Sequence, residues 1–114
     1  MKIYGVRVWV DDMEAAKRFY GETLGLTAKW EMDVAIGYDL GVDLIVEHDD
    51  GVEHEGALIG RFVGASIQVD DIDATYEDLT AKGVRFLGPP TKMFWGGTLA
   101  HFKDPAGNTL TLLA

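Results

Sequence analysis

An internal repeat is the feature that most constrains how this chain can fold. Residues 5–15, GVRVWVDDMEA, align without a gap with residues 64–74, GASIQVDDIDA. In both segments apolar residues alternate with others up to an Asp-Asp pair, which is the pattern of a half-buried strand. After each pair apolar residues recur at helical spacing, and a glycine follows at 25 and at 83, where helices commonly end. The repeat therefore predicts two copies of a unit in which a strand leads into a helix capped by aspartate.

Short β-like segments follow each predicted helix. In the first copy they are residues 34–36 and 42–47; in the second they are 84–87, 98–102 and 109–113, with a hairpin turn at 104–108. Each copy then has the order β-α-β-β-β. We expect one α+β domain over residues 1–114, with module one at about 1–50, a polar connector at about 48–63 and module two at about 64–114.

Charge and composition exclude several classes of function. The chain has 10 Lys and Arg against 19 Asp and Glu, a net charge of -9, so its field repels nucleic acid and anionic membrane surfaces. It has no cysteine, which excludes disulfides and thiolate metal sites. The start lacks the apolar core of a signal peptide, and no apolar run approaches the roughly 20 residues that span a bilayer. We expect a cytoplasmic protein with no nucleic-acid or membrane partner.

Three motifs occur along the chain in a distinctive order. They are residues 8–20 with Leu24-Gly25-Leu26 after them, residues 69–72, and residues 102–108. Together with the repeat, they resemble the vicinal oxygen chelate superfamily, which includes glyoxalase I, extradiol dioxygenases, fosfomycin-resistance enzymes and bleomycin-resistance proteins. The resemblance covers the whole chain. It implies paired βαβββ modules whose curled, open mixed sheet surrounds a cavity, usually completed in a homodimer.

The metal ligands of that family are missing at the positions that match them here. The resemblance places the family's ligands at Gly5 and Gly64 in the first strands and at Ile45 and Thr111 in the last strands. None of these is a usual ligand of a divalent metal, so we expect no metal and no cofactor. A shift of two residues would bring Glu47 to the site, but one carboxylate does not make a binding shell. The histidines at 48, 54 and 101 form no helical i, i+4 pair.

Residues that share a face with the lost ligands are the candidates for ligand binding. Alternation places Arg7 and Trp9 beside Gly5, Ser66 and Gln68 beside Gly64, and apolar residues on the opposite face. Trp30 and Trp95 could add aromatic faces, or they could fill the core or a dimer contact; Trp95-Gly96-Gly97 resembles a family element at the cavity mouth. Arg7 could contact a ligand or pair internally with an acid such as Glu47. The full set of ligand candidates is Arg7, Trp9, Trp30, Ser66, Gln68, Trp95, His101 and Thr111.

These features favour metal-free binding of a small hydrophobic or planar molecule, such as a drug or toxin that the protein sequesters. One alternative is a lyase, isomerase or dioxygenase of the same superfamily, with an unusual metal-ligand set or with His101 or Glu47 as acid and base. Another is an accessory protein whose cavity is vestigial and whose dimer surface binds a partner.

Overall fold

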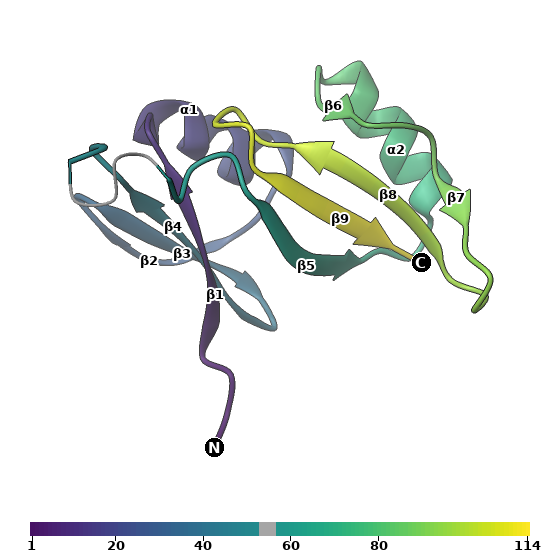
Figure 1. Cartoon of the computed structure of the whole chain (residues 1–114), viewed down its shortest axis with the longest axis horizontal. Coiled ribbons are helices and arrows are strands. Elements are labelled where there is room, and N and C mark those ends of the chain that lie inside the picture. The colour runs from purple at the N-terminus through teal and green to yellow at the C-terminus, as the bar shows by residue number, and fades with distance from the viewer. Residues whose placement is uncertain (53–56) are drawn as a thin grey trace.

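Two β-sheets lie side by side in the computed structural model, which describes residues 1–52 and 57–114 (Figure 1). The first sheet has the strand order β1-β4-β3-β2. β1 runs parallel to β4, and the other neighbours are antiparallel. The strands are β1 (Gly5–Val10), β2 (Ala28–Met32), β3 (Ala35–Leu40) and β4 (Val42–His48).

The second sheet repeats this connectivity. Its order is β5-β9-β8-β6, β5 is parallel to β9, and the short β7 also pairs with β8. The strands are β5 (Phe62–Gln68), β6 (Arg85–Phe86), β7 (Thr91–Lys92), β8 (Thr98–Lys103) and β9 (Thr109–Leu113). The predicted α+β architecture with curled, open sheets is thereby confirmed. The sheets do not close on each other, and β1 and β5 lie where they meet (Figure 1).

Each sheet carries a helix whose start is capped as predicted. α1 (Met13–Lys17) continues into a π-helix, η1 (Arg18–Thr23), and α2 covers Ile72–Ala81. The Asp12 carboxylate accepts a hydrogen bond from the amide of Ala15 at 3.1 Å, and Asp71 accepts one from Ala74 at 3.0 Å. Both aspartates therefore satisfy free amides at a helix start. The described residues contain no helix long and apolar enough to cross a membrane.

One hydrophobic core joins the two halves of the chain. Val8 and Val10 are 1% exposed, while Arg7 between Val6 and Val8 is exposed, as the alternation along β1 predicts. The ring centroid of Phe19 in η1 lies 6.2 Å from that of Phe102 in the second sheet, so η1 packs against both sheets. Leu110 and Leu112 of β9 belong to the same buried cluster.

Strand β2 and the π-helix were not predicted. All residues of β2 except Trp30 are exposed, so the strand lacks the apolar alternation by which a half-buried strand is recognised. The apolar residues within 13–24 follow helical spacing. This spacing does not distinguish an α-helix from the wider π-helix that the chain forms over Arg18–Thr23.

Candidate ligand-binding site

An arginine on the first sheet is held between a carboxylate and an indole. Arg7 and Trp9 lie on the face of β1 opposite the core, and Glu47 of β4 is the register partner of Trp9. Arg7 Nε donates to Glu47 Oε1 at 2.7 Å, and Arg7 Nη2 donates to Oε2 at 3.0 Å. The guanidinium lies over the Trp9 ring, 4.8 Å from its centroid. The hydrogen bond and charge of Glu47 raise the pKa of Arg7, so this planar cation stays charged and oriented.

A pocket of about 390 Å³ opens beside this cluster. Its volume lies within the range of about 300–1,000 Å³ that small-molecule sites occupy. Asp49 is buried in its wall: Oδ1 accepts a hydrogen bond from the amide of Gly51 at 2.8 Å, but Oδ2 has no partner among the described residues. A buried oxygen without a donor is costly, so the wall retains an acceptor for a ligand or water. The lining residues are Arg7, Trp9, Val34, Glu47, His48, Asp49 and Asp50.

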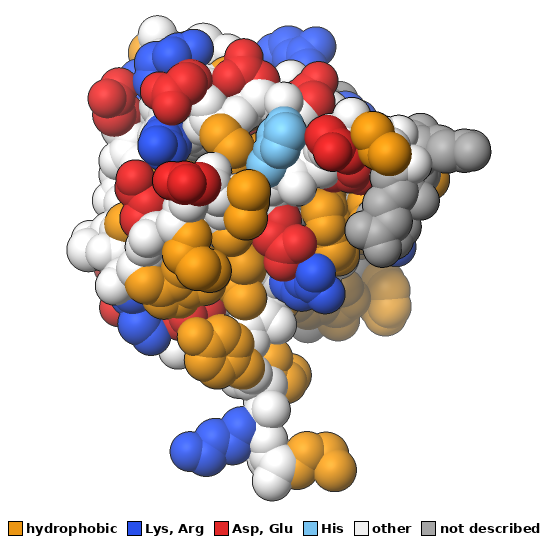
Figure 2. Space-filling model, turned by 90° about the vertical axis from the view of Figure 1, so that its left-hand side faces the viewer, with side chains coloured by type: hydrophobic (Ala, Val, Ile, Leu, Met, Phe, Trp, Pro, Cys, Tyr) orange, Lys and Arg blue, Asp and Glu red, His pale blue; other side chains and the backbone are white. Residues whose placement is uncertain are grey.

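On the side of the molecule shown in Figure 2, acidic side chains lie around a hydrophobic patch. The pocket itself offers a ligand the apolar Val34, the Trp9 ring and the charges of Arg7 and Glu47. Pockets with these components orient small organic molecules.

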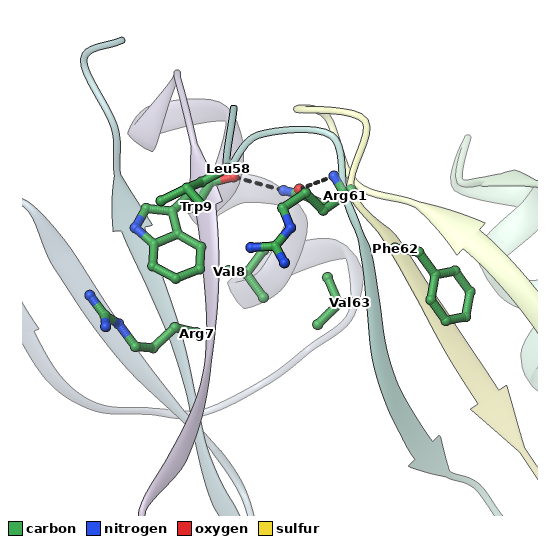
Figure 3. A pocket seen from close by; sticks show the side chains of 8 residues that line it. Arg7, Val8, Trp9, Leu58, Arg61, Phe62 and Val63 are labelled. Atoms are coloured by element: carbon green, nitrogen blue, oxygen red, sulfur yellow. Dashed lines mark hydrogen bonds between the residues drawn. The ribbon is translucent and has the colours of Figure 1, made fainter. Parts of the chain in front are cut away.

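The predicted ligand residues of the two sheets face different sides. Arg7 and Trp9 extend from β1 to one side, whereas Phe62 extends from β5 to the other, and Arg61 and Val63 point into the space between the strands (Figure 3). A pocket of about 100 Å³ lies beside Arg61 and Val63. A larger one of about 440 Å³ also lies between the sheets, and its lining includes Val6, Leu44, Ser66 and Gln68.

Ser66 and Gln68 of β5 are exposed, as Phe62 is. Ser66 pairs with Thr111, which bonds His101, and the Phe62 ring packs against that imidazole, so these side chains share one face. The structure therefore does not bring all the predicted cavity residues together within one chain.

A histidine and a threonine form the centre of the second face. His101 Nδ1 lies 2.8 Å from Thr111 Oγ1, and the Phe62 ring packs edge-on against the imidazole at 5.6 Å between centroids. Ser66 is the register partner of Thr111, so it adjoins this pair. Thr111 is 3% exposed and its hydroxyl is engaged, so of this pair the imidazole is the group that a ligand can reach.

Trp30 is engaged inside the first sheet. A β-bulge between Ala28 and Trp30 lets two consecutive side chains reach one carboxylate: Lys29 Nζ donates to Asp43 Oδ1 at 2.8 Å, and Trp30 Nε1 donates to Oδ2 at 2.9 Å. These donors, Lys29 first, lower the pKa of Asp43, which is 3% exposed. The indole also lies against Gly37, where an added Cβ would be 2.3 Å from the ring. Trp30 and Asp43 thus shape the floor of this face.

Trp95 lies apart from these clusters. It belongs to the loop between β7 and β8, at the far end of the second sheet from β1 (Figure 1). Its ring lies against Gly97, and the residue is 52% exposed. In this position the indole can reach a ligand only if that ligand, or a second copy of the chain, covers the loop.

A buried polar network connects the two sheets. It includes residues 104–108, for which the sequence predicted a hairpin turn and nothing more. Asp104, 1% exposed, accepts hydrogen bonds from the Tyr20 hydroxyl at 2.7 Å and from the Asn108 amide at 2.8 Å. Asn108 Nδ2 donates to the carbonyl of Trp9 at 2.8 Å, and its Oδ1 accepts from the amides of Gly60 and Arg61. The network fixes β1, which carries the candidate site, to the second sheet. The unusual burial of these polar residues was not visible in the sequence.

The positions that the family resemblance assigns to metal ligands do not fit a metal centre. A Cβ on Gly5 would lie 2.6 Å from the backbone oxygen of Asp43, so a ligand side chain there requires β4 to move. Gly64 has a φ of 75°, a left-handed conformation that strains other residues. Ile45 has no donor atom, and the Thr111 hydroxyl is bonded to His101.

The histidines do not supply an alternative centre within the described residues, which contain no group of three or more side chains placed to hold a metal ion. His48 lines the pocket beside Trp9, and His101 lies on the other sheet. His54, together with its neighbours from 53 to 56, lies outside the described residues. No step of a reaction is therefore assigned to a metal.

Comparisons with known proteins agree with this architecture. The family model described as the Glyoxalase/Bleomycin resistance protein/Dioxygenase superfamily matches residues 2–112. Among curated proteins, the uncharacterized protein YraH of Bacillus subtilis (strain 168) is 30% identical over 126 residues, covering 98% of this chain and 97% of that protein. The uncharacterized protein YetH of the same organism is 32% identical over 118 residues, covering 94% of this chain and 92% of that protein.

Solved structures show the same fold. A superfamily member from Sphaerobacter thermophilus DSM 20745 superposes with a TM-score of 0.80 at 29% identity, covering 99% of this chain and 96% of that chain. UcmS2 superposes with a TM-score of 0.82 at 27% identity, covering 99% and 97%. These likenesses extend over both modules, and the relatives' printed names specify no ligand.

Proposed function

Since this chain belongs to the Glyoxalase/Bleomycin resistance protein/Dioxygenase superfamily, we propose that it binds a small planar organic molecule on its first sheet without a metal ion. One fold in this superfamily hosts several chemistries, so the residues of the site decide which function this chain has. Sequestration of a drug or toxin is the role that such binding would serve.

The observation that carries the proposal is the Arg7 guanidinium held by Glu47 over Trp9 at the edge of a 390 Å³ pocket. Two of the guanidinium N–H groups bond Glu47, and the others remain for a ligand carbonyl or ring nitrogen. Trp9 supplies an aromatic face on which a flat molecule can stack. This cluster orients a ligand through fixed hydrogen bonds and contact area, and it needs no Lewis acid to do so.

A homodimer is part of the proposal. Large apolar side chains are exposed on the second sheet and in its β7–β8 loop: Phe62 is 62% exposed, Phe94 99% and Trp95 52%. A two-fold related copy could cover such residues and bring the second face of one chain over the first face of the other. In that arrangement Ser66, Gln68 and His101 would join Arg7 and Trp9 around one ligand.

Acid–base catalysis is the second candidate, and the His101–Thr111 contact favours it. The hydrogen bond at 2.8 Å engages Nδ1 and orients the imidazole, so Nε2 is the ring nitrogen left for a ligand. A histidine held in this way can accept a proton from a bound molecule. Conversion of a bound ligand, lost in His101→Gln with binding retained, would establish an enzyme.

The test is a thermal-shift screen of planar aromatic compounds, run with and without EDTA. We expect a hit to raise the unfolding temperature equally in both conditions, because bound ligand stabilises only the folded state. Arg7→Met should abolish the shift, and Arg18→Met, which removes an exposed arginine of η1, should preserve it. Loss of the shift in EDTA, or equal shifts in the two variants, would contradict the proposal.

A further inference from the structure

A separate pocket of about 340 Å³ lies on the helix side of the second sheet. Leu112 and Phe102 reach it, and they alternate along β9 and β8 with Thr111 and His101. Because neighbouring side chains in a strand point to opposite faces, this pocket lies on the other side of the sheet from His101. It is therefore distinct from the ligand site proposed above.

The wall of this pocket is formed by the hydrophobic core. Leu79, Phe102 and Leu112 are at most 5% exposed and belong to the buried cluster, while Leu24, Leu26 and Ile67 pack against it at the opening. Residues of η1 and of α2 line two sides of the pocket, Glu22 and Thr23 on the one and Thr75 and Asp78 on the other. The pocket can bury an apolar body with the volume of about eleven liquid water molecules.

The π-helix borders this pocket where its turn widens. The amide of Leu24 donates to the carbonyl of Phe19 at 2.8 Å, and the amide of Leu26 donates to Tyr20 at 3.0 Å. These long-range turns, together with Gly25 at a φ of 73°, direct both leucines to the pocket. π-helical turns are rare and occur frequently at functional sites. The π-helix at its border therefore indicates a functional pocket independently of the apolar lining.

The mouth of the pocket is electronegative. Glu22 lies there, and within the described residues its carboxylate has no ion-pair partner. Asp78 is also at the mouth, but Lys82 neutralises it at 3.1 Å. The last carbonyls of a helix lack intrahelical partners and carry partial negative charge, and those of η1 end beside Glu22. A cationic or strongly donating group is favoured at this position.

We propose that this pocket binds a small aliphatic amine, with its hydrocarbon chain over Ile67 and Leu112 and its ammonium group at Glu22. The proposal stands independently of the planar-ligand site, since the two pockets share no lining residue. Affinity should rise about fourfold for each added methylene until the pocket is filled, because burial of apolar surface stabilises the complex.

The experiment is a titration of the methyl-labelled protein with hexylammonium, hexan-1-ol and hexanoate, followed by NMR. We expect the methyl signals of Leu24, Leu26, Ile67 and Leu79 to shift, with hexylammonium binding most tightly and hexanoate most weakly. Glu22→Gln should weaken hexylammonium binding about threefold and leave hexanol binding unchanged. Glu77→Gln, an exposed change on α2 outside the pocket, should alter neither.

Several outcomes would overturn the proposal. They are the absence of methyl shifts with all three compounds, equal affinity for hexanoate and hexylammonium, or shifts centred on the Trp9 indole. Binding that survives Glu22→Gln without change would equally contradict the placement of the ammonium group. Because Glu22 is exposed, its substitution leaves the core intact and the result is readable.

Discussion

Replacing Tyr20 by phenylalanine tests whether the buried polar network stabilises the junction of the two modules. The Tyr20 hydroxyl donates to Asp104 Oδ2 at 2.7 Å, and both residues are at most 1% exposed. Burial, followed by the charge of Asp104, raises the pKa of Tyr20 well above its usual value, so the phenol remains a donor. Phenylalanine keeps the ring that packs edge-on against Phe19 at 5.1 Å, so the change removes one hydrogen bond without opening a cavity.

The magnitude follows from the partner's charge and burial. Hydrogen bonds to charged groups contribute about 1.5–3 kcal/mol, and a buried carboxylate that loses a donor cannot replace it with bulk water. Asp104 Oδ2 retains one donor, Asn108 Nδ2 at 2.9 Å, so the loss should stay within that range. For a chain of this length the unfolding temperature should fall by about 6–12 °C.

Urea unfolding followed by tryptophan fluorescence at neutral pH measures the effect. Tyr76→Phe is the matched control: its ring packs against Phe86 at 4.7 Å, but its hydroxyl has no hydrogen bond among the described residues, so the loss should be below about 0.5 kcal/mol. Asp104→Asn removes the charge of the acceptor. Its loss and that of Tyr20→Phe should not add in the double variant, because both changes weaken the same bond. If Tyr20→Phe unfolds at the same urea concentration as Tyr76→Phe, the inferred role of the network is wrong.

Three further predictions concern stability. Lys29 and Trp30 lower the pKa of Asp43, so the stability that the charged carboxylate contributes is present at neutral pH and is lost as pH falls below about 4. The urea midpoints of wild type and Asp43→Asn should therefore converge in acid. A difference between the midpoints that stays constant with pH would refute this. Gly64→Ala should cost about 1–2 kcal/mol because of its positive φ, whereas Gly88→Ala, which meets no atom within 4 Å, should be close to neutral by the same assay. Asp71→Ala should lose about 1 kcal/mol through the helix cap, and Asp70→Ala, the neighbouring exposed carboxylate, should lose much less by circular dichroism melting.

The elements that local patterns specify were predictable. Alternation in residues 5–10 and 64–69 identified β1 and β5, and Asp12 and Asp71 cap the helices as expected. β2 was not predictable, because its exposed residues carry no apolar period and it is held by pairing with β3 and by the contacts of Trp30. Its bulge at Lys29 depends on the partner strand, which no local window contains.

The candidate site was predicted in its components and not in its assembly. Alternation placed Arg7 and Trp9 on the face opposite the core, and the structure agrees. Arg7 pairs with Glu47, which was one of the two alternatives for this arginine. The sequence could not decide between them, because the two residues lie 40 positions apart in the chain. The wall formed by Asp49 and the role of Asp43 were missed, since neither residue carries a motif.

The sequence by itself determined the strand and helix starts, the two-fold repetition of the unit, and the absence of donor side chains at the expected metal positions, because these depend on residue types and their spacing. Only the tertiary structure decided which side chains meet. The parallel register of β1 with β4 sets Trp9 beside Glu47, and it also brings Gly5 so close to β4 that a Cβ is excluded. At the junction of β1 and β5, the candidate residues Arg7 and Trp9 extend to one side and Phe62 extends to the other (Figure 3). Such contacts arise from long-range strand pairing and core packing, and no local pattern of residues encodes them.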